Sequence, residues 1–188
     1  MRVLATIAIA AALVACGQPA VSNGDAAAQA PGAGDGQAAY VEACVARYVA
    51  QSAQARQWAP NQCVEDWRRV VASAPLAEAI LAAAAGRPPT GNRLGDLAVT
   101  VDRNARTSTW SWSETGGLIP YDAIGALEQR GAAARMIGCS QLGAGEFTKV
   151  YAVTPAGGSA FQLSIYERSA PTANAESFYN VIAHAAGR

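Results

Sequence analysis

The sequence has few of the side chains from which most catalytic and metal sites are built. Its 188 residues include a single histidine, His184, and four cysteines, none of them in a CxxC pair. Zinc sites need clustered cysteine and histidine ligands, so we expect no metal ion and no cofactor. His184 stands near the end of a segment with helical spacing, where a helix C-terminus simply favours its charged form. We therefore do not expect it to act as a catalytic base.

The sequence also lacks an excess of either charge. Lys and Arg total 14, Asp and Glu total 14, and charged residues make up 15% of the chain. Binding to nucleic acid depends on a basic field, so we expect no nucleic-acid partner. Removal of an N-terminal segment that contains Arg2 would leave 13 basic residues against 14 acidic ones, a net charge of −1.

The N-terminal apolar run is too short to span a membrane. Residues 3–14 are uncharged and, at about 1.5 Å per helical residue, would reach roughly 18 Å, against a hydrocarbon core of about 30 Å. A basic residue followed by such a run is typical of an export signal. The sequence therefore predicts a signal peptide over residues 1–15.

The end of this run, Leu13-Val14-Ala15-Cys16, resembles the lipobox of bacterial lipoprotein precursors. The resemblance implies that a diacylglyceryl group is attached to the Cys16 thiol, that the signal peptide is cleaved before Cys16, and that the new amine is acylated. The lipid at Cys16 would then bind the protein to the membrane. Gly17, rather than Asp, follows the cysteine, which in this class favours the outer membrane, with the protein facing the periplasm. The alternative is an ordinary secretory signal cut after Ala15.

The next segment is predicted to be a disordered tether over residues 16–39. It consists mostly of Gly, Ala, Pro, Gln and Ser, and Val21 is its one aliphatic residue larger than Ala. Such a composition buries too little apolar surface to offset the loss of chain entropy.

Residues 40–87 have the spacing of helices. Apolar side chains recur at i, i+3, i+4 and i+7 from Tyr40, which predicts a first amphipathic helix. A second is expected from near Gln62, with a break at Pro75 and a further helix over residues 76–85. The segment is predicted to be an antiparallel helix pair with an extension.

Cys44 and Cys63 are expected to form a disulfide between these helices, because an exported protein meets an oxidising compartment. In a straight hairpin that turns near Trp58, however, Cys44 would lie roughly 20 Å from the turn. The bond therefore requires the first helix to end near Gln51 or the helices to cross steeply. The alternatives join Cys139 to one of the two or leave all three reduced; a mid-strand Cys139 is expected to be buried and unreactive.

Residues 93–188 change to the period-2 alternation of strands. We expect about five antiparallel strands, a short helix after Pro120 and a final helix over residues 173–186. Short turns between successive strands favour an antiparallel sheet with helices on one face. The predicted fold class is α+β, with the helical segment and this segment packed as one domain. The expected strands are residues 97–101, 107–113, 135–141, 147–153 and 160–167.

Trp110 and Trp112 share one face of the strand at 107–113, opposite Thr109, Ser111 and Ser113. On an exposed face the two rings would form an aromatic platform for a sugar or a partner protein. The alternative is that they fill the core, since a chain poor in large aliphatic residues needs aromatic bulk.

Three functions are compatible with this sequence. We expect a non-catalytic envelope lipoprotein that binds or supports an envelope protein or glycan. The second hypothesis is a lipoprotein inhibitor of an envelope-attacking enzyme, with the loop at residues 113–117 as its inhibitory segment. The third is a small cell-wall hydrolase, which would need two carboxylates facing a cleft; Glu65 and Asp66, adjacent on a helix, diverge by about 100° and do not form such a pair.

Overall fold

The computed structural model describes residues 35–87, 90–104, 106–114, 120–172 and 175–185. The predicted signal peptide, the lipobox with Cys16 and residues 17–34 of the predicted tether lie outside these ranges. The class is α+β, as predicted, with four α-helices, a six-stranded antiparallel sheet and a small two-stranded sheet in the described ranges. None of the helices so described is long and apolar enough to cross a membrane.

The first half of the structure is helical. Helix α1 (Asp35–Gln51) begins inside the predicted tether, so the expectation of disorder up to residue 39 is wrong for its last five residues. A short 3₁₀ helix, η1 (Ala53–Gln57), leads into α2 (Ala59–Ala72) and α3 (Ala74–Ala84). Pro75 lies in the first turn of α3, where its missing N–H costs nothing. The predicted break between these two helices is thus confirmed.

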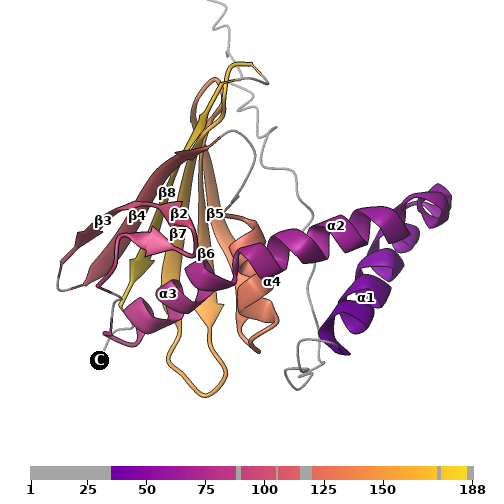
Figure 1. Cartoon of the computed structure of the whole chain (residues 1–188), viewed down its shortest axis with the longest axis horizontal. Coiled ribbons are helices and arrows are strands. Elements are labelled where there is room, and N and C mark those ends of the chain that lie inside the picture. The colour runs from indigo at the N-terminus through magenta and orange to yellow at the C-terminus, as the bar shows by residue number, and fades with distance from the viewer. Residues whose placement is uncertain (1–34, 88–89, 105, 115–119, 173–174, 186–188) are drawn as a thin grey trace, which may run out of the picture.

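The Cys44–Cys63 disulfide is present and joins α1 to α2, with 5.8 Å between the two Cα atoms. The geometric condition set by the sequence is met because α1 ends at Gln51 and the chain turns back through η1. The Tyr40 and Trp67 rings meet at a tilt of 46°, with ring centroids 5.3 Å apart, and add a second contact between these helices. Together they hold α1 on α2 as an arm that projects from the sheet (Figure 1).

The main sheet has the strand order β3-β4-β8-β7-β6-β5, and each neighbouring pair is antiparallel. A separate two-stranded ribbon, β1 and β2, precedes it, and the short helix α4 (Asp122–Glu128) lies between β4 and β5, as predicted. The strands are β1 (Arg93–Leu94), β2 (Leu97–Ala98), β3 (Thr100–Arg103), β4 (Thr107–Glu114), β5 (Ala133–Gly143), β6 (Glu146–Thr154), β7 (Phe161–Arg168) and β8 (Ser177–His184).

The predicted C-terminal helix over residues 173–186 is wrong. Ser177–His184 forms strand β8, which is inserted between β4 and β7 and pairs with both along its length. Tyr179, Val181 and Ala183 alternate as buried residues, with half-buried ones between them. The alanine-rich segment fits a helical period, but two neighbouring strands supply a backbone ladder on each side, and this tertiary context overrides the helical preference.

The helices cover one face of the sheet. Helix α3 packs on β4 and β8, and α4 packs on β5 (Figure 1). The core lies between these layers, and burial of each large apolar side chain there contributes about 1.5–3 kcal/mol. Its fully buried members include Leu76, Ile80, Trp110, Leu127, Leu163, Ile165 and Val181.

Candidate ligand-binding face of the sheet

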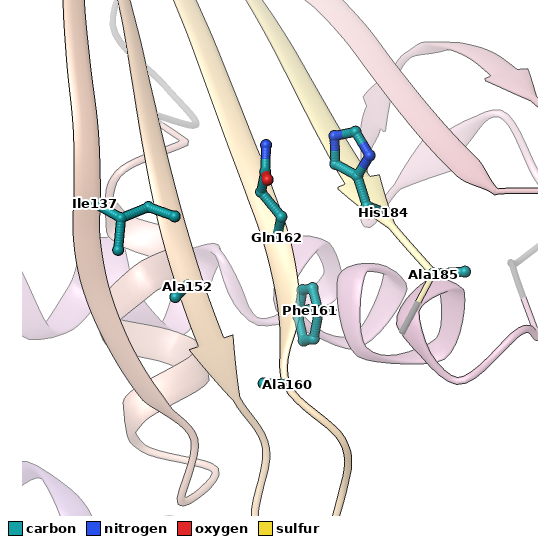
Figure 2. A pocket seen from close by; sticks show the side chains of 7 residues that line it. All are labelled: Ile137, Ala152, Ala160, Phe161, Gln162, His184 and Ala185. Atoms are coloured by element: carbon teal, nitrogen blue, oxygen red, sulfur yellow. The ribbon is translucent and has the colours of Figure 1, made fainter. Parts of the chain in front are cut away.

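The second face of the six-stranded sheet is the candidate functional site. Because side chains alternate across a strand, the residues between the buried ones on β4, β7 and β8 point away from the helices. In the part of the chain that the structure describes, no helix packs on this side; Figure 2 views the sheet from it, with the helices behind the strands. We refer to this surface as the open face, made up of residues such as Thr109, Ser111, Thr148, Ser164, Tyr166, Asn180 and His184.

A belt of uncharged polar side chains crosses the open face from edge to edge. The register places one hydroxyl or amide on every strand: Ser140 is opposite Thr148, Thr148 opposite Tyr166, Tyr166 opposite Asn180, Asn180 opposite Ser111, and Ser111 opposite Thr100. Partners directly opposite in an antiparallel pair share a face. With strands about 4.8 Å apart, five intervals give a belt about 24 Å long. We call these six residues the hydroxyl belt.

The hydroxyl belt is only partly exposed at its centre. Thr148, Tyr166, Asn180 and Ser111 are half-buried, whereas the terminal members are exposed. The Oδ1 atom of Asn180 is buried and has no hydrogen-bond partner. An unsatisfied buried acceptor costs about 1–3 kcal/mol, which the Asn180 amide would recover by turning its oxygen toward a donor on the open face.

The row beside the belt is more apolar. Val150, Ser164, Ile182 and Thr109 are register partners on the four central strands and are all half-buried. The methyl groups of Val150, Ile182 and Thr109 give the belt a low-polarity flank, on which carbon atoms of a ligand can pack.

A shallow hollow of about 360 Å³ lies at the end of the open face, where the chain leaves β8. Its lining includes Ile137 from the edge strand β5, Gln162 from β7 and His184 from β8 (Figure 2). Ile137 is 48% exposed, which makes it one of the few large apolar side chains open to solvent. His184 thus lies on a sheet face, not in the last turn of a helix as predicted.

The opposite end of the open face is aromatic and charged. Tyr166 meets Phe178 edge to face, with ring centroids 6.1 Å apart, and the guanidinium of Arg168 lies 5.7 Å from the Phe178 ring. The charge of Arg168 is therefore held at this end, one row away from the hydroxyl belt.

The predicted aromatic platform is wrong. Trp110 and Trp112 are only 1% and 4% exposed, because both point into the core between the sheet and the helices. Trp112 packs on Tyr179, with ring centroids 5.6 Å apart. The alternative, that the two rings supply core bulk, describes the structure.

A polar cluster that was not expected from the sequence lies on the helix-covered side of the sheet. The Lys149 ammonium lies 4.2 Å from the centre of the Tyr121 ring at the start of α4. Burial raises the pKa of Tyr121 far above its ordinary value, and the neighbouring Glu167 carboxylate adds to the shift. A phenol kept neutral in this way stabilises the packing of α4 and offers no proton at neutral pH.

A second polar cluster links α2 to α4. The Arg69 guanidinium bonds the Asp66 carboxylate and lies 3.6 Å from Asp122 Oδ2. Burial raises the pKa of Asp122, and the Arg69 charge partly opposes this. Glu65 pairs instead with Arg68 on the exposed side of α2, so Glu65 and Asp66 diverge as predicted.

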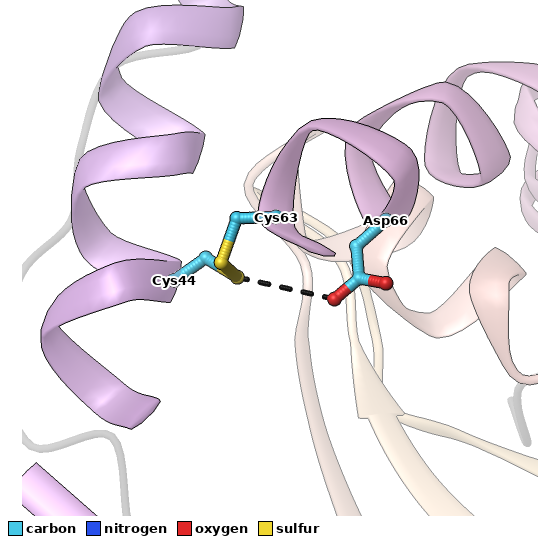
Figure 3. A group of neighbouring side chains, drawn as sticks. All are labelled: Cys44, Cys63 and Asp66. Carbon is cyan, nitrogen blue, oxygen red and sulfur yellow. Dashed lines mark hydrogen bonds between the residues drawn. A yellow bond between two sulfur atoms is a disulfide. The ribbon is translucent and has the colours of Figure 1, made fainter. Parts of the chain in front are cut away.

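Asp66 also approaches the disulfide, with 3.9 Å between Cys44 Sγ and Asp66 Oδ2 (Figure 3). Cys44, Cys63 and Asp66 lie close enough together to suggest a metal site. In the disulfide, however, neither sulfur is a thiolate, and metal ligation by cysteine requires one. The group therefore does not suit a metal ion, and without a thiol proton the contact is not a hydrogen bond.

Two further expectations concerned Cys139 and the loop at residues 113–117. Cys139, on β5, is half-buried and disulfide-bonded, so the expectation of an unreactive thiol there is wrong. Of the loop at residues 113–117 proposed as an inhibitory segment, Ser113 is exposed at the end of β4, and residues 115–117 lie outside the described ranges.

A scan against protein-family models, a search of curated proteins and a search of solved structures each found no match for this chain.

Proposed function

We propose that this protein is a non-catalytic lipoprotein of the bacterial cell envelope that binds another envelope component on the open face of its sheet. The anchor would be the lipidated Cys16, and Gly17 after it favours the outer membrane, with the domain facing the periplasm. The observation that supports the binding role is the sheet itself: α3 and α4 cover one face, and the other presents a continuous belt of polar side chains beside a more apolar row.

The described polar clusters favour binding over catalysis. Tyr121 is held neutral by burial and by Glu167, and the Asp66 and Asp122 carboxylates are both engaged by Arg69 between two helices. Glycosidase chemistry instead needs a pair of carboxyl groups on either side of a bound sugar. The open face has the hydrogen-bonding groups of a recognition surface.

The anchor is tested by replacing Cys16 in the full chain. Cys16→Ser is expected to move the protein from the membrane to the soluble periplasmic fraction and to abolish incorporation of labelled palmitate, whereas Ser22→Ala leaves both unchanged. Because Cys44 and Cys63 pair with each other, Cys16 is the one remaining cysteine of this chain that could form the disulfide at Cys139. A sulfur that carries a thioether cannot also form a disulfide, so mass spectrometry of the N-terminal peptide decides between the lipid and the disulfide at Cys16. A protein that stays in the membrane as Cys16→Ser, or a Cys16 found in a disulfide, would refute the anchor.

The binding role is tested with a photoreactive amino acid placed in cells. At Thr109, half-buried in the centre of the open face, it is expected to give a discrete crosslinked species that disappears in the Cys16→Ser background. The matched control is Ala85, exposed at the end of α3 on the helical side. Equal crosslinking from both positions, or none from Thr109, would refute a specific binding role for the open face in cells.

A further inference from the structure

We infer that the ligand of the open face is a neutral, hydroxyl-rich glycan chain that lies along the hydroxyl belt. This inference rests on the proposed function and adds the chemical class of the ligand. It starts from the register, which aligns Ser140, Thr148, Tyr166, Asn180, Ser111 and Thr100 across six strands.

The chemistry of the belt matches that of an uncharged sugar polymer. Its hydroxyls both donate and accept hydrogen bonds, and the Asn180 amide does the same through two different atoms. A glycan offers the same mixture of donors and acceptors along its length. None of the six belt residues is charged, and Arg168, one row away, lies against the Phe178 ring with Glu146 as its register partner. A charged polymer on the belt therefore gains little in return for the desolvation of its charges.

The length of the hydroxyl belt and the apolar row beside it also favour a glycan ligand. A belt about 24 Å long suits an extended chain that meets each strand in turn. Val150, Ile182 and the Thr109 methyl group run parallel to it and can pack on the C–H faces of sugar rings. Tyr166, at the centre, supplies an aromatic ring together with a hydroxyl.

Asn180 provides an independent observation. Its Oδ1 atom is buried without a partner at the middle of the belt, and such orphaned acceptors are rare in folded proteins. Because this oxygen is closed to solvent, a ligand hydroxyl or acetamide N–H would satisfy it only after the Asn180 amide turns toward the open face. A protein partner is less well suited, because the cores of protein interfaces are enriched in large aromatic and apolar anchors, and the belt contains only Tyr166 of that kind.

The test uses the exported full chain carrying Cys16→Ser, with chitohexaose and cellohexaose as neutral probes and an oligogalacturonate of similar length as the anionic probe. Isothermal titration calorimetry is expected to detect binding of at least one neutral probe and none of the anionic one. Thr148→Val, Ser111→Ala and Tyr166→Phe each remove one hydroxyl with little change of shape. Each is expected to weaken binding by about twofold to tenfold, and the triple variant to abolish it.

The matched control is Thr154→Val, at the exposed end of the same strand as Thr148 and outside the belt. It is expected to bind as the parent does, and equal urea midpoints for all variants show that the fold is intact. Binding of the anionic probe alone, no binding of either neutral probe, or full binding by the triple variant would overturn the inference.

Failure of the glycan assignment can be distinguished from failure of the proposed binding function. If crosslinking from Thr109 in cells captures a protein, and the triple variant still forms that crosslink, the open face is a binding surface but its ligand is not a glycan. If Thr109 gives no crosslink at all while a neutral probe binds the belt in solution, the glycan assignment stands and the in-cell role is wrong.

Discussion

Trp110 on β4 and Val181 on β8 are register partners, and both are buried, with 1% and 0% of their surface exposed. The pair joins the middle of the chain to its C-terminal strand. A helix at Val181, as the sequence predicted, would leave Trp110 without this partner and β4 without its neighbour β8.

Val181→Ala is expected to lower the free energy of unfolding by about 2 kcal/mol, because it removes buried methyl groups at the centre of the sheet. Urea unfolding followed by circular dichroism measures the change. Val71→Ala is the matched control, since Val71 is 52% exposed on α2, and a change within about 0.5 kcal/mol is expected there. Equal effects at the two positions would contradict the central place of β8.

Loss of the Cys44–Cys63 disulfide is expected to cost about 3 kcal/mol, given a separation of 19 residues. The double variant Cys44→Ser/Cys63→Ser tests this by urea unfolding, together with amide hydrogen exchange. Because α1 packs mainly on α2 and η1, faster exchange is expected in α1, with β8 still protected. Simultaneous loss of protection in α1 and β8 would show that the arm is not a separate stability unit.

Trp110 and Trp112 are expected to be shielded from acrylamide in a Trp58→Phe/Trp67→Phe background, because both lie in the core. Trp58 is 48% exposed, so a variant that keeps Trp58 alone is the accessible control. The measurement is the quenching constant of the tryptophan fluorescence. If the two core tryptophans were quenched as strongly as Trp58, they would be accessible to solvent, as the platform hypothesis requires.

Asp122 makes stability depend on pH in an unusual direction for a carboxylate. Burial raises its pKa in the folded state, with Arg69 opposing and Asp66 reinforcing the shift. The folded protein therefore holds this proton more tightly than the unfolded chain does. Its contribution to stability is present below the unfolded-state pKa and is lost as pH rises through the raised pKa.

Asp122→Asn should remove this component, since the amide does not titrate. The difference in unfolding free energy between variant and parent is expected to shift in favour of the variant as pH rises across the acidic range. Urea unfolding at a series of pH values measures it, with Asp102→Asn on the exposed edge strand β3 as control. A difference that stays constant with pH would show that Asp122 titrates normally.

Local patterns in the sequence determined much of the architecture. The alternation at 107–113 and 160–167 predicted β4 and β7, and Pro75 predicted the break between α2 and α3, because these signals depend only on side-chain period and on the missing proline N–H. The disulfide followed from two cysteines on neighbouring helices, and the required early end of α1 was found at Gln51.

Other features were decided by the tertiary structure alone. Residues 177–184 fit a helical period, and only the ladders offered by β4 and β7 make them a strand. Which face of the sheet the helices cover decided that Trp110 is core and Ser111 belongs to the open face. The hydroxyl belt is likewise invisible in the sequence, because its six members are spread from Thr100 to Asn180 and only the register of long-range pairing brings them into one row.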